Sequence, residues 1–243
     1  MESNKKVSIK LLTREDKQQA FEKTREQFDI PGVKLVLITE EYYEKALELC
    51  RDYFVPDEPL NKAFGLQYTE EMESFWLQFL KLHLSLMFVD EETGEPIAFR
   101  TTNIASRGEK LDLNSIKTNS LREILRFIFY CDNEAGFFDY YGTDEAFNFL
   151  GLVVSRKYQK RGFATRIFRA AVDMIRHFGF DEVYIKGAGT SNYSKKIYEK
   201  EGFEILYETF YDNYEVDGRF PIQNTGEHKS MKEYGFKVTQ KQS

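Results

Sequence analysis

The chain has 243 residues, which is enough for one well-buried domain with additions. Lys and Arg number 34 against 40 Asp and Glu, so the net charge of −6 argues against nucleic acid as the main partner, because phosphate backbones favour basic surfaces. No run reaches the ~18 apolar residues of a membrane span, and two cysteines without a cleavable signal segment lead us to expect a cytoplasmic protein.

The first part of the chain divides after Pro31-Gly32. Residues 1–32 are predicted to be an N-terminal extension of unknown role, in which residues 7–12 suit a strand and residues 14–28 suit a helix. The main domain, residues 33–243, is predicted to begin with a strand over residues 33–38. A helix with a clear apolar stripe follows that strand. The stripe consists of Tyr43, Ala46, Leu47, Cys50 and Phe54.

That helix is predicted to end at an elbow over residues 55–61. Glu58 precedes Pro59, so its backbone is pushed toward extended geometry, while Pro59 is well placed to begin another helix. The elbow therefore fixes a carboxylate on a stiff segment. Beyond it we expect a helix over residues 72–83, strands over residues 84–89 and 97–104, a polar loop over residues 105–119, and a helix around residues 121–128.

A strand, a basic glycine loop and an amphipathic helix come next, in that order. The strand is the apolar run 149–154, and the loop contains Gly162. The helix has an apolar stripe of Ile167, Phe168, Ala171, Ile175 and Phe178, and Gly179 stands where a left-handed residue ends a helix.

This order makes an anion site. A helix start leaves about four backbone N–H groups without intrahelical partners and carries partial positive charge. Gly162 lets the backbone approach a phosphate without a Cβ in the way. Four basic side chains surround the same point: Arg156, Lys157, Lys160 and Arg161. The loop is neither G-x-x-x-x-G-K-[ST] nor G-x-G-x-x-G, and a pyrophosphate fits it well.

Gln159-x-x-Gly162-x-Ala164 resembles the acetyl-CoA loop of the GCN5-related N-acetyltransferases, Q/R-x-x-G-x-G/A. A second stretch strengthens the resemblance: residues 181–186 read as a strand, residues 191–200 as a helix, and Glu201-Gly202-Phe203 closes the pair. The resemblance implies an α/β (α+β) fold with a central mixed, mostly antiparallel sheet, splayed at the acetyl-CoA site and flanked by helices. Independently, alternation predicts a strand over residues 203–212, with Ile205, Tyr207, Thr209 and Tyr211 on one face, and residues 228–238 suit a final strand after a polar loop over residues 214–227.

The same resemblance implies that acetyl-CoA is the co-substrate and that no metal is needed. We expect the cofactor contacts to come from the last strand residues, the loop, the helix start and the start of the later helix. These residues are Leu152, Val153, Val154, Gln159, Lys160, Arg161, Gly162, Phe163, Ala164, Thr165, Asn192 and Ser194.

The pentapeptide 57–61, D-E-P-L-N, narrows the resemblance to the arylalkylamine N-acetyltransferases of the insect and nematode type, which acetylate dopamine, tyramine, octopamine, serotonin and tryptamine. In that family the glutamate is the general base, so the role transfers to Glu58, with Asp57 as the competing carboxylate. The family also has two serines four residues apart, at positions that are Thr190 and Ser194 here. The threonine is a departure, which favours Ser194.

Tyr198 corresponds to the tyrosine that many members of the wider superfamily use to protonate the leaving thiolate. Ser194 and Tyr198 are therefore rival candidates for one role, and the sequence does not decide between them.

The chemistry supports a carboxylate base independently of the family. A primary alkylamine is mostly protonated at neutral pH, and only its lone pair attacks a thioester, so a nearby carboxylate can bind the ammonium and take its proton. Two alternatives stay open: a transferase for a polyamine or for a lysine or N-terminal amine of a protein, and a catalytically silent acyl-CoA-binding module. We expect a monomer that binds acetyl-CoA and a small amine.

Aromatic residues make up 16% of the chain and gather in two segments, residues 127–149 and 203–214. We expect both segments to border the acceptor side of the splayed strands, where ring faces suit a flat aromatic amine and its cation. Burial in the core would also explain most of these rings.

Overall fold

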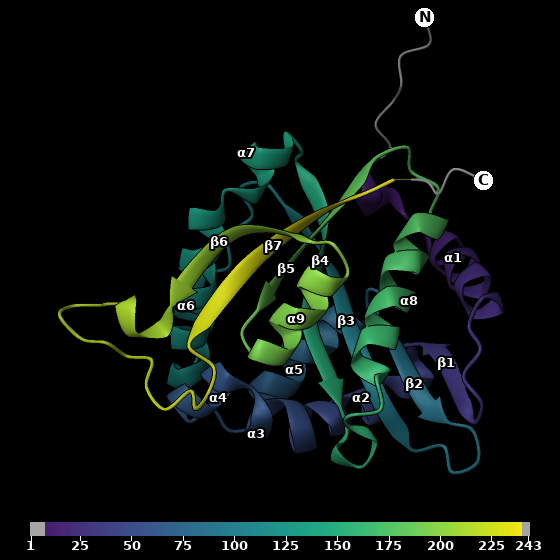
Figure 1. The fold of residues 1–243 in the computed structure, drawn as a ribbon, viewed down its shortest axis with the longest axis horizontal. Coiled ribbons are helices and arrows are strands. Elements are labelled where there is room, and N and C mark those ends of the chain that lie inside the picture. The colour runs from purple at the N-terminus through teal and green to yellow at the C-terminus, as the bar shows by residue number, and fades with distance from the viewer. Residues whose placement is uncertain (1–7, 240–243) are drawn as a thin grey trace, which may run out of the picture.

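A computed structural model describes residues 8–239 of the protein. Its centre is one seven-stranded sheet with the strand order β1-β2-β3-β4-β5-β7-β6 (Figure 1). All neighbouring strands are antiparallel except β4 and β5, which are parallel. The mixed, mostly antiparallel sheet is therefore confirmed. The strands are β1 (Val33–Leu37), β2 (Leu86–Asp90), β3 (Pro96–Ser106), β4 (Glu145–Val154), β5 (Val183–Gly189), β6 (Glu204–Phe210) and β7 (Ser230–Val238).

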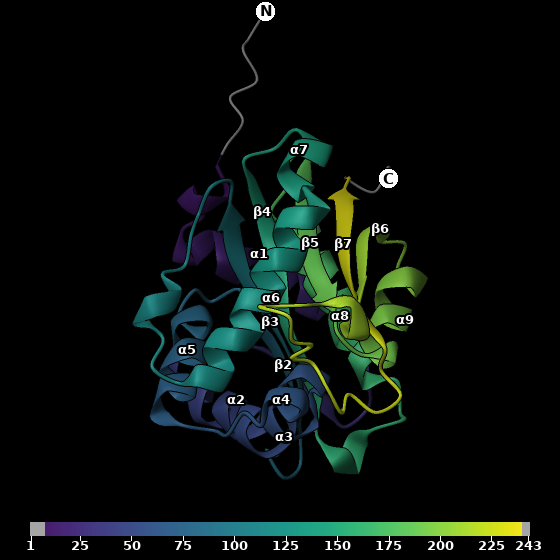
Figure 2. The same ribbon diagram turned by 90° about the vertical axis from the view of Figure 1, so that its left-hand side faces the viewer.

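Helices cover both faces of this sheet (Figures 1 and 2). One face carries α1 (Arg14–Glu26), α8 (Phe163–His177) and α9 (Asn192–Lys200). The other face carries α2 (Tyr43–Leu49), α3 (Val55–Asp57), α4 (Pro59–Phe64), α5 (Glu70–Leu80) and α6 (Asn119–Ala135), while α7 (Phe137–Tyr141) lies at the opposite end of the sheet from α3 and α4. No helix among residues 8–239 combines the length and the apolar character that crossing a bilayer requires.

The helix after the glycine loop forms as expected. The stripe residues Ile167, Phe168, Ala171 and Ile175 are all buried, and they pack in the core between α8 and the sheet. Gly179 has a φ of +77°, the left-handed conformation that ends a helix. The 3.6-residue period thus predicted both the helix and the face that it buries.

The N-terminal segment departs from its prediction at residues 7–12, where Ile9–Leu11 form a 3₁₀ turn in place of a strand; residue 7 lies outside the described residues. The helix that follows is α1, which begins with a capping box between Thr13 and Asp16. Ala20 and Phe21 of α1 are buried in the core beside α8. The domain boundary at residue 33 stays a prediction.

Four other expectations need correction. Helix α5 ends at Leu80, and His83, with a φ of 53°, lies in the turn before β2. The predicted loop 105–119 begins with the last residues of β3 and contains a 3₁₀ turn. The stripe residue Phe54 lies in a π-helical turn, Cys50–Phe54, which leads into α3. In β6 a bulge between Ile205 and Tyr207 breaks the expected alternation and leaves Ile205 exposed.

The parallel strands β4 and β5 pair only between Phe147–Phe149 and Ile185–Gly187. Between Arg100↔Leu152 and Thr102↔Phe149, β4 advances three residues while β3 advances two, so β4 carries a bulge just past the last paired residue. A bulge bends its strand and increases the local twist, which ends the pairing with β5. We call the divergence of β4 and β5 beyond Phe149 and Gly187 the splay.

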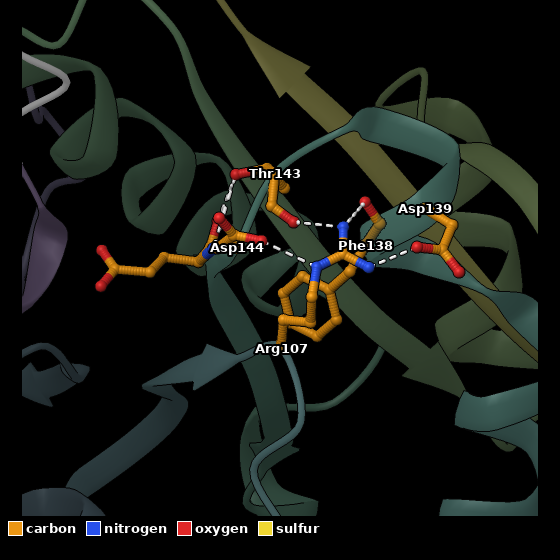
Figure 3. A network of polar contacts seen from close by, with 6 residues as sticks. Arg107, Phe138, Asp139, Thr143 and Asp144 are labelled. Atoms are coloured by element: carbon orange, nitrogen blue, oxygen red, sulfur yellow. Dashed lines mark hydrogen bonds and ion pairs between the residues drawn. The ribbon is translucent and has the colours of Figure 1, made fainter.

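The other end of β4 is held by Arg107, which lies one residue past β3. Its guanidinium binds the carboxylates of Asp139 and Asp144 and donates to the carbonyl oxygens of Phe138, at 2.7 Å, and Thr143, at 3.1 Å (Figure 3). These contacts tie α7 and the start of β4 to the end of β3. We call this start of β4, with the Arg107 contacts, the pinned end; β4 and β5 diverge at the other end of β4.

Candidate active site

The loop before α8 has the geometry of an anion site. Gly162 is the N-cap of α8 with a φ of +80°, and no side chain caps the helix there, so the first N–H groups of α8 keep their capacity to bind an anion. An added Cβ at Gly162 would meet nothing within 4 Å, so the need for glycine comes from the backbone angle and not from crowding. Gln159 donates from its side chain to the carbonyl of Val154, which holds the loop against the end of β4.

The four basic side chains of this region divide into two pairs. Arg156 binds Asp57 at 3.0 Å, and Lys157 binds Glu95 at 2.6 Å. Lys160 and Arg161 are exposed and form no ion pair within the described chain, and Arg161 lies over the Tyr158 ring. Lys160 and Arg161 are therefore the cations that remain for a pyrophosphate, while Arg156 and Lys157 fasten the loop to its neighbours.

The elbow has the backbone that its prolines predict. Glu58 is extended, with φ −70° and ψ 133°, and Pro59 begins α4. The Glu58 side chain caps α4, because Oε2 accepts a hydrogen bond of 2.7 Å from the backbone N–H of Asn61. Its other oxygen, Oε1, is buried without a hydrogen-bond partner in the described residues. A carboxylate with one oxygen held and one left over is suited to receive a proton donor.

The Glu58 carboxylate faces the end of β5. The Thr190 side chain approaches it without satisfying Oε1, and the Tyr211 hydroxyl donates to the Thr190 carbonyl oxygen at 2.6 Å. Burial raises the pKa of Glu58 above the ordinary glutamate value, and this effect exceeds the opposing hydrogen bonds from Asn61 and Thr190. Burial also raises the pKa of Tyr211, and the nearby Glu58 carboxylate raises it further. Tyr211 lies in the aromatic segment 203–214 that the sequence places beside the acceptor, whereas its hydrogen bond to the Thr190 carbonyl oxygen is a long-range contact that the sequence does not predict.

Asp57 lies beside Glu58 but faces a different partner. It is exposed and forms the ion pair with Arg156, so the elbow is joined directly to the loop that precedes α8. A paired, exposed carboxylate is a poorer base than a buried one with a raised pKa. The geometry therefore favours Glu58 over Asp57.

Ser194 belongs to the cap of α9. Its backbone N–H donates to the Ser191 hydroxyl, its own hydroxyl accepts from the Ser191 N–H at 3.2 Å, and the same hydroxyl donates to the Ser191 carbonyl oxygen at 3.1 Å. Asn192 is also engaged, since its side chain donates to the Glu227 carbonyl oxygen and its backbone N–H donates to His228. Both residues hold the start of α9 in place.

Tyr198 is fully buried under α8, at the floor of the splay. A Cβ on Gly187, the last paired residue of β5, would stand 2.2 Å from the Tyr198 hydroxyl oxygen, so glycine leaves the room that this side chain fills. The hydroxyl accepts a hydrogen bond of 2.6 Å from Arg100. Arg100 was missed at the sequence level, although one arginine inside the apolar strand 97–104 was a visible signal.

The aromatic residues divide among several places, so the two segments do not border a single site, and their role in holding the acceptor stays a prediction. Phe127, Tyr130, Tyr211 and Tyr214 contact one another between α6 and the segment after β6. A recess of about 450 Å³ lies there, lined by Tyr130, Asn213, Tyr214, Glu215, Val216 and Asp217. Phe147, Phe149 and Phe203 lie in the core under α8, and other rings lie in or around α7. Phe129 and Tyr207 pack against the core on the opposite face, and Phe210 is exposed.

No group of three or more His, Cys, Asp or Glu side chains in residues 8–239 is arranged to hold a metal ion. The cysteines Cys50 and Cys131 are buried and free.

Residues 47–203 match the acetyltransferase (GNAT) family. The fold is similar to that of arylalkylamine N-acetyltransferase 2 from Aedes aegypti, with a TM-score of 0.77 and 22% identity over 84% of this chain and 98% of that one. It is also similar to the putative arylalkylamine N-acetyltransferase 7 of the same mosquito, with a TM-score of 0.76 and 27% identity over 84% of this chain and 87% of that one. Drosophila melanogaster polyamine N-acetyltransferase shares the fold as well, with a TM-score of 0.74 and 14% identity over 85% of this chain and 100% of that one.

The protein therefore belongs to the GNAT family of acetyltransferases and is an acyltransferase. The family uses acetyl-CoA as acetyl donor, and the free helix start at Gly162 with Lys160 and Arg161 is chemically suited to its pyrophosphate.

Proposed function

We propose that this protein transfers the acetyl group of acetyl-CoA to the primary amine of small arylalkylamines, with Glu58 as the general base. The observation that carries the proposal is the half-buried Glu58, whose Oε1 atom is buried with no partner in the described chain and whose pKa is raised. An ammonium that enters beside Oε1 would supply the missing hydrogen bond and give up its proton, which frees the lone pair for attack on the thioester.

Three groups of residues have separate tasks in this reaction. Gly162 and the start of α8, with Lys160 and Arg161, hold the pyrophosphate. The elbow positions the base, and its Asp57–Arg156 pair fixes the distance between base and cofactor loop. Ser194 or Tyr198 protonates the sulfur as the thiolate leaves.

The acceptor class rests on the rings beside the recess. Tyr130 and Tyr214 line it, and Phe127 packs against Tyr214 with ring centroids 4.7 Å apart. Ring faces and edges favour an aromatic amine over an aliphatic one. The Aedes aegypti enzymes named for arylalkylamines support the same class, since they share this fold.

A polyamine is the second candidate, because Glu215 and Asp217 also line the recess and would pair with a second ammonium. The Drosophila fold relative is named for polyamines. A molecule with two ammonium groups would bind more tightly because of both carboxylates, whereas an arylalkylamine would bind more tightly because of its contacts with the rings.

Thiol release from acetyl-CoA, measured over a panel of amines, tests the proposal. Tyramine, dopamine, tryptamine and serotonin should exceed spermidine and a lysine peptide in kcat/KM by about 10- to 200-fold, the range that differences in apolar contact supply. Spermidine as the best substrate would replace the arylalkylamine assignment with the polyamine one. Binding of acetyl-CoA without turnover of any amine would leave a silent binding module.

A further inference from the structure

Arg100 is the most unusual charged residue in this protein. It is 1% exposed, its Nε is buried without a hydrogen-bond partner, and no carboxylate in residues 8–239 forms an ion pair with it. A buried and uncompensated charge costs several kcal/mol in general, so proteins avoid one unless it has a task. Burial correspondingly lowers the pKa of Arg100.

What stabilises the guanidinium is an aromatic cage. The guanidinium carbon Cζ of Arg100 lies 4.2 Å from the Phe149 ring centroid, 5.1 Å from that of Phe168 and 5.6 Å from that of Tyr198. Rings attract a cation without neutralising it. The positive charge is thus held in place and stays available to a neighbouring atom.

That neighbouring atom is the Tyr198 hydroxyl oxygen, 2.6 Å from Nη2 of Arg100. Because arginine has no acceptor, the hydroxyl oxygen accepts this bond and its hydrogen must point elsewhere. The Tyr198 ring is held rigidly, stacked on Tyr234 at 4.6 Å and packed edge-on against Phe168. The hydroxyl lies against Gly187, where β4 and β5 part.

We propose that Arg100 is a positioning residue that directs the Tyr198 hydroxyl hydrogen into the splay, so that Tyr198 protonates the departing coenzyme sulfur. The inference rests on the proposed acetyl transfer and decides between the two rival donors. As the new N–C bond forms and the C–S bond breaks, the electron pair leaves on sulfur, and the Tyr198 proton moves to it. The phenolate that results is stabilised by the Arg100 charge until the products leave and water entering the splay returns the proton.

The groups that face Tyr198 agree with this role. Burial raises the pKa of Tyr198, while Arg100 on β3 lowers it through its charge and its hydrogen bond. Glu233 on β7 raises the pKa of Tyr198, although Glu233 itself has a pKa raised to about 8 by burial and is mostly neutral at neutral pH. Tyr234 on β7 is neutral, and α8 and β5 present Phe168 and Gly187. Among residues 8–239, Arg100 is therefore the one strong charge at this hydroxyl.

Arg100→Met removes the charge and the donor while it keeps an unbranched chain in the cage. We expect kcat to fall about 10- to 100-fold, the range for a lost hydrogen bond to a charged group, while the Kd of acetyl-CoA changes less than threefold. The midpoint of thermal unfolding should stay level or rise, because the buried charge is relieved. A purely structural arginine would give the reverse pattern, a lower midpoint with unchanged kcat per folded molecule.

A double-variant cycle completes the test. In a Tyr198→Phe background, Arg100→Met should cause no further loss of kcat beyond about twofold, because the hydroxyl through which it acts is gone. Equal losses in both backgrounds would overturn the proposal. Arg100→Gln keeps a neutral hydrogen-bond donor and should retain an intermediate kcat. It replaces Arg100→Met in the test if Arg100→Met fails to fold. Full activity in Arg100→Gln would also overturn the proposal.

The wild-type protein separates the two levels of the argument. If it acetylates no amine, the proposed function fails, but the unfolding midpoint of Arg100→Met still reports whether Arg100 is held at a cost to stability. If it acetylates amines normally and the cycle is additive, the proposed function stands and the role of Arg100 falls.

Discussion

Two arginines at opposite ends of β4 have opposite surroundings. At the pinned end, the half-exposed Arg107 binds two carboxylates and two carbonyl oxygens (Figure 3). At the splay, the buried Arg100 donates a hydrogen bond to one hydroxyl group and lies over three aromatic rings. The arginine that holds the fold together has its polar partners, whereas the arginine at the splay keeps a buried Nε without one in the described chain.

The carboxylates follow the same division. Asp139 and Asp144 are exposed and paired with Arg107, whereas Glu58 buries an oxygen that has no partner in the described chain. A buried carboxylate oxygen left without a partner destabilises the folded protein, and a bound ligand can supply the missing hydrogen bond. The comparison predicts that changes at the splay lower activity more than stability, and that changes at the pinned end do the opposite.

The largest effect is expected at Glu58. Glu58→Ala should lower kcat/KM by ~10²–10⁴, the usual span for a lost general base, and should also cost about 1 kcal/mol of unfolding free energy because the α4 cap is lost. Glu58→Gln is the matched variant, since the side-chain oxygen of glutamine can still accept the hydrogen bond from the backbone N–H of Asn61. It should lose the activity and keep the stability in urea unfolding. Near-normal turnover by Glu58→Gln at neutral pH would remove Glu58 from the mechanism.

The next effect is on cofactor affinity. Gly162→Asp places a negative charge and a strained backbone at the start of α8, and calorimetry should show at least tenfold weaker acetyl-CoA binding. Gly179→Asp is the control, because Gly179 has nearly the same φ, +77°, and equal free space at the other end of the same helix. Similar losses of affinity in both variants would mean that strain in α8 is responsible and that the loop assignment is wrong.

A smaller effect separates the two candidate proton donors. Tyr198→Phe should lower kcat about tenfold or more with acetyl-CoA affinity intact, while Ser194→Ala should mainly weaken the cap of α9, by about 1 kcal/mol. Ser191→Ala disrupts the same cap from its other side and keeps the Ser194 hydroxyl. If Ser194→Ala loses far more kcat than Ser191→Ala does, Ser194 is the donor.

The smallest effect on catalysis is expected at the pinned end. Arg107→Gln should leave kcat/KM within about twofold and lower the unfolding free energy by ~1 kcal/mol, because exposed ion pairs contribute little individually. Steady-state kinetics and thermal unfolding check both values. A strong loss of activity here would show that the two ends are coupled and would break the division between them.

Local features of this structure were predictable from the sequence, and long-range contacts were not. The elbow at Glu58 and the N-cap at Gly162 follow from proline, glycine and the residues within one helical turn of them, and both took the expected geometry. The Arg100–Tyr198 bond joins residues 98 positions apart. Which sheet face each ring occupies depends on register, and the bulges in β4 and β6 shifted it by one residue.

The pH dependence of kcat/KM tests the central claim most directly, because it reports the protonation state of the base in the free enzyme. Glu58 must be ionised to act, and burial raises its pKa, so activity should rise with pH through a limb that lies above the ordinary glutamate value of 4.5. In Glu58→Gln that limb should vanish, and the activity deficit should shrink at high pH as more amine arrives unprotonated. An acid limb that persists unchanged in Glu58→Gln would contradict the account.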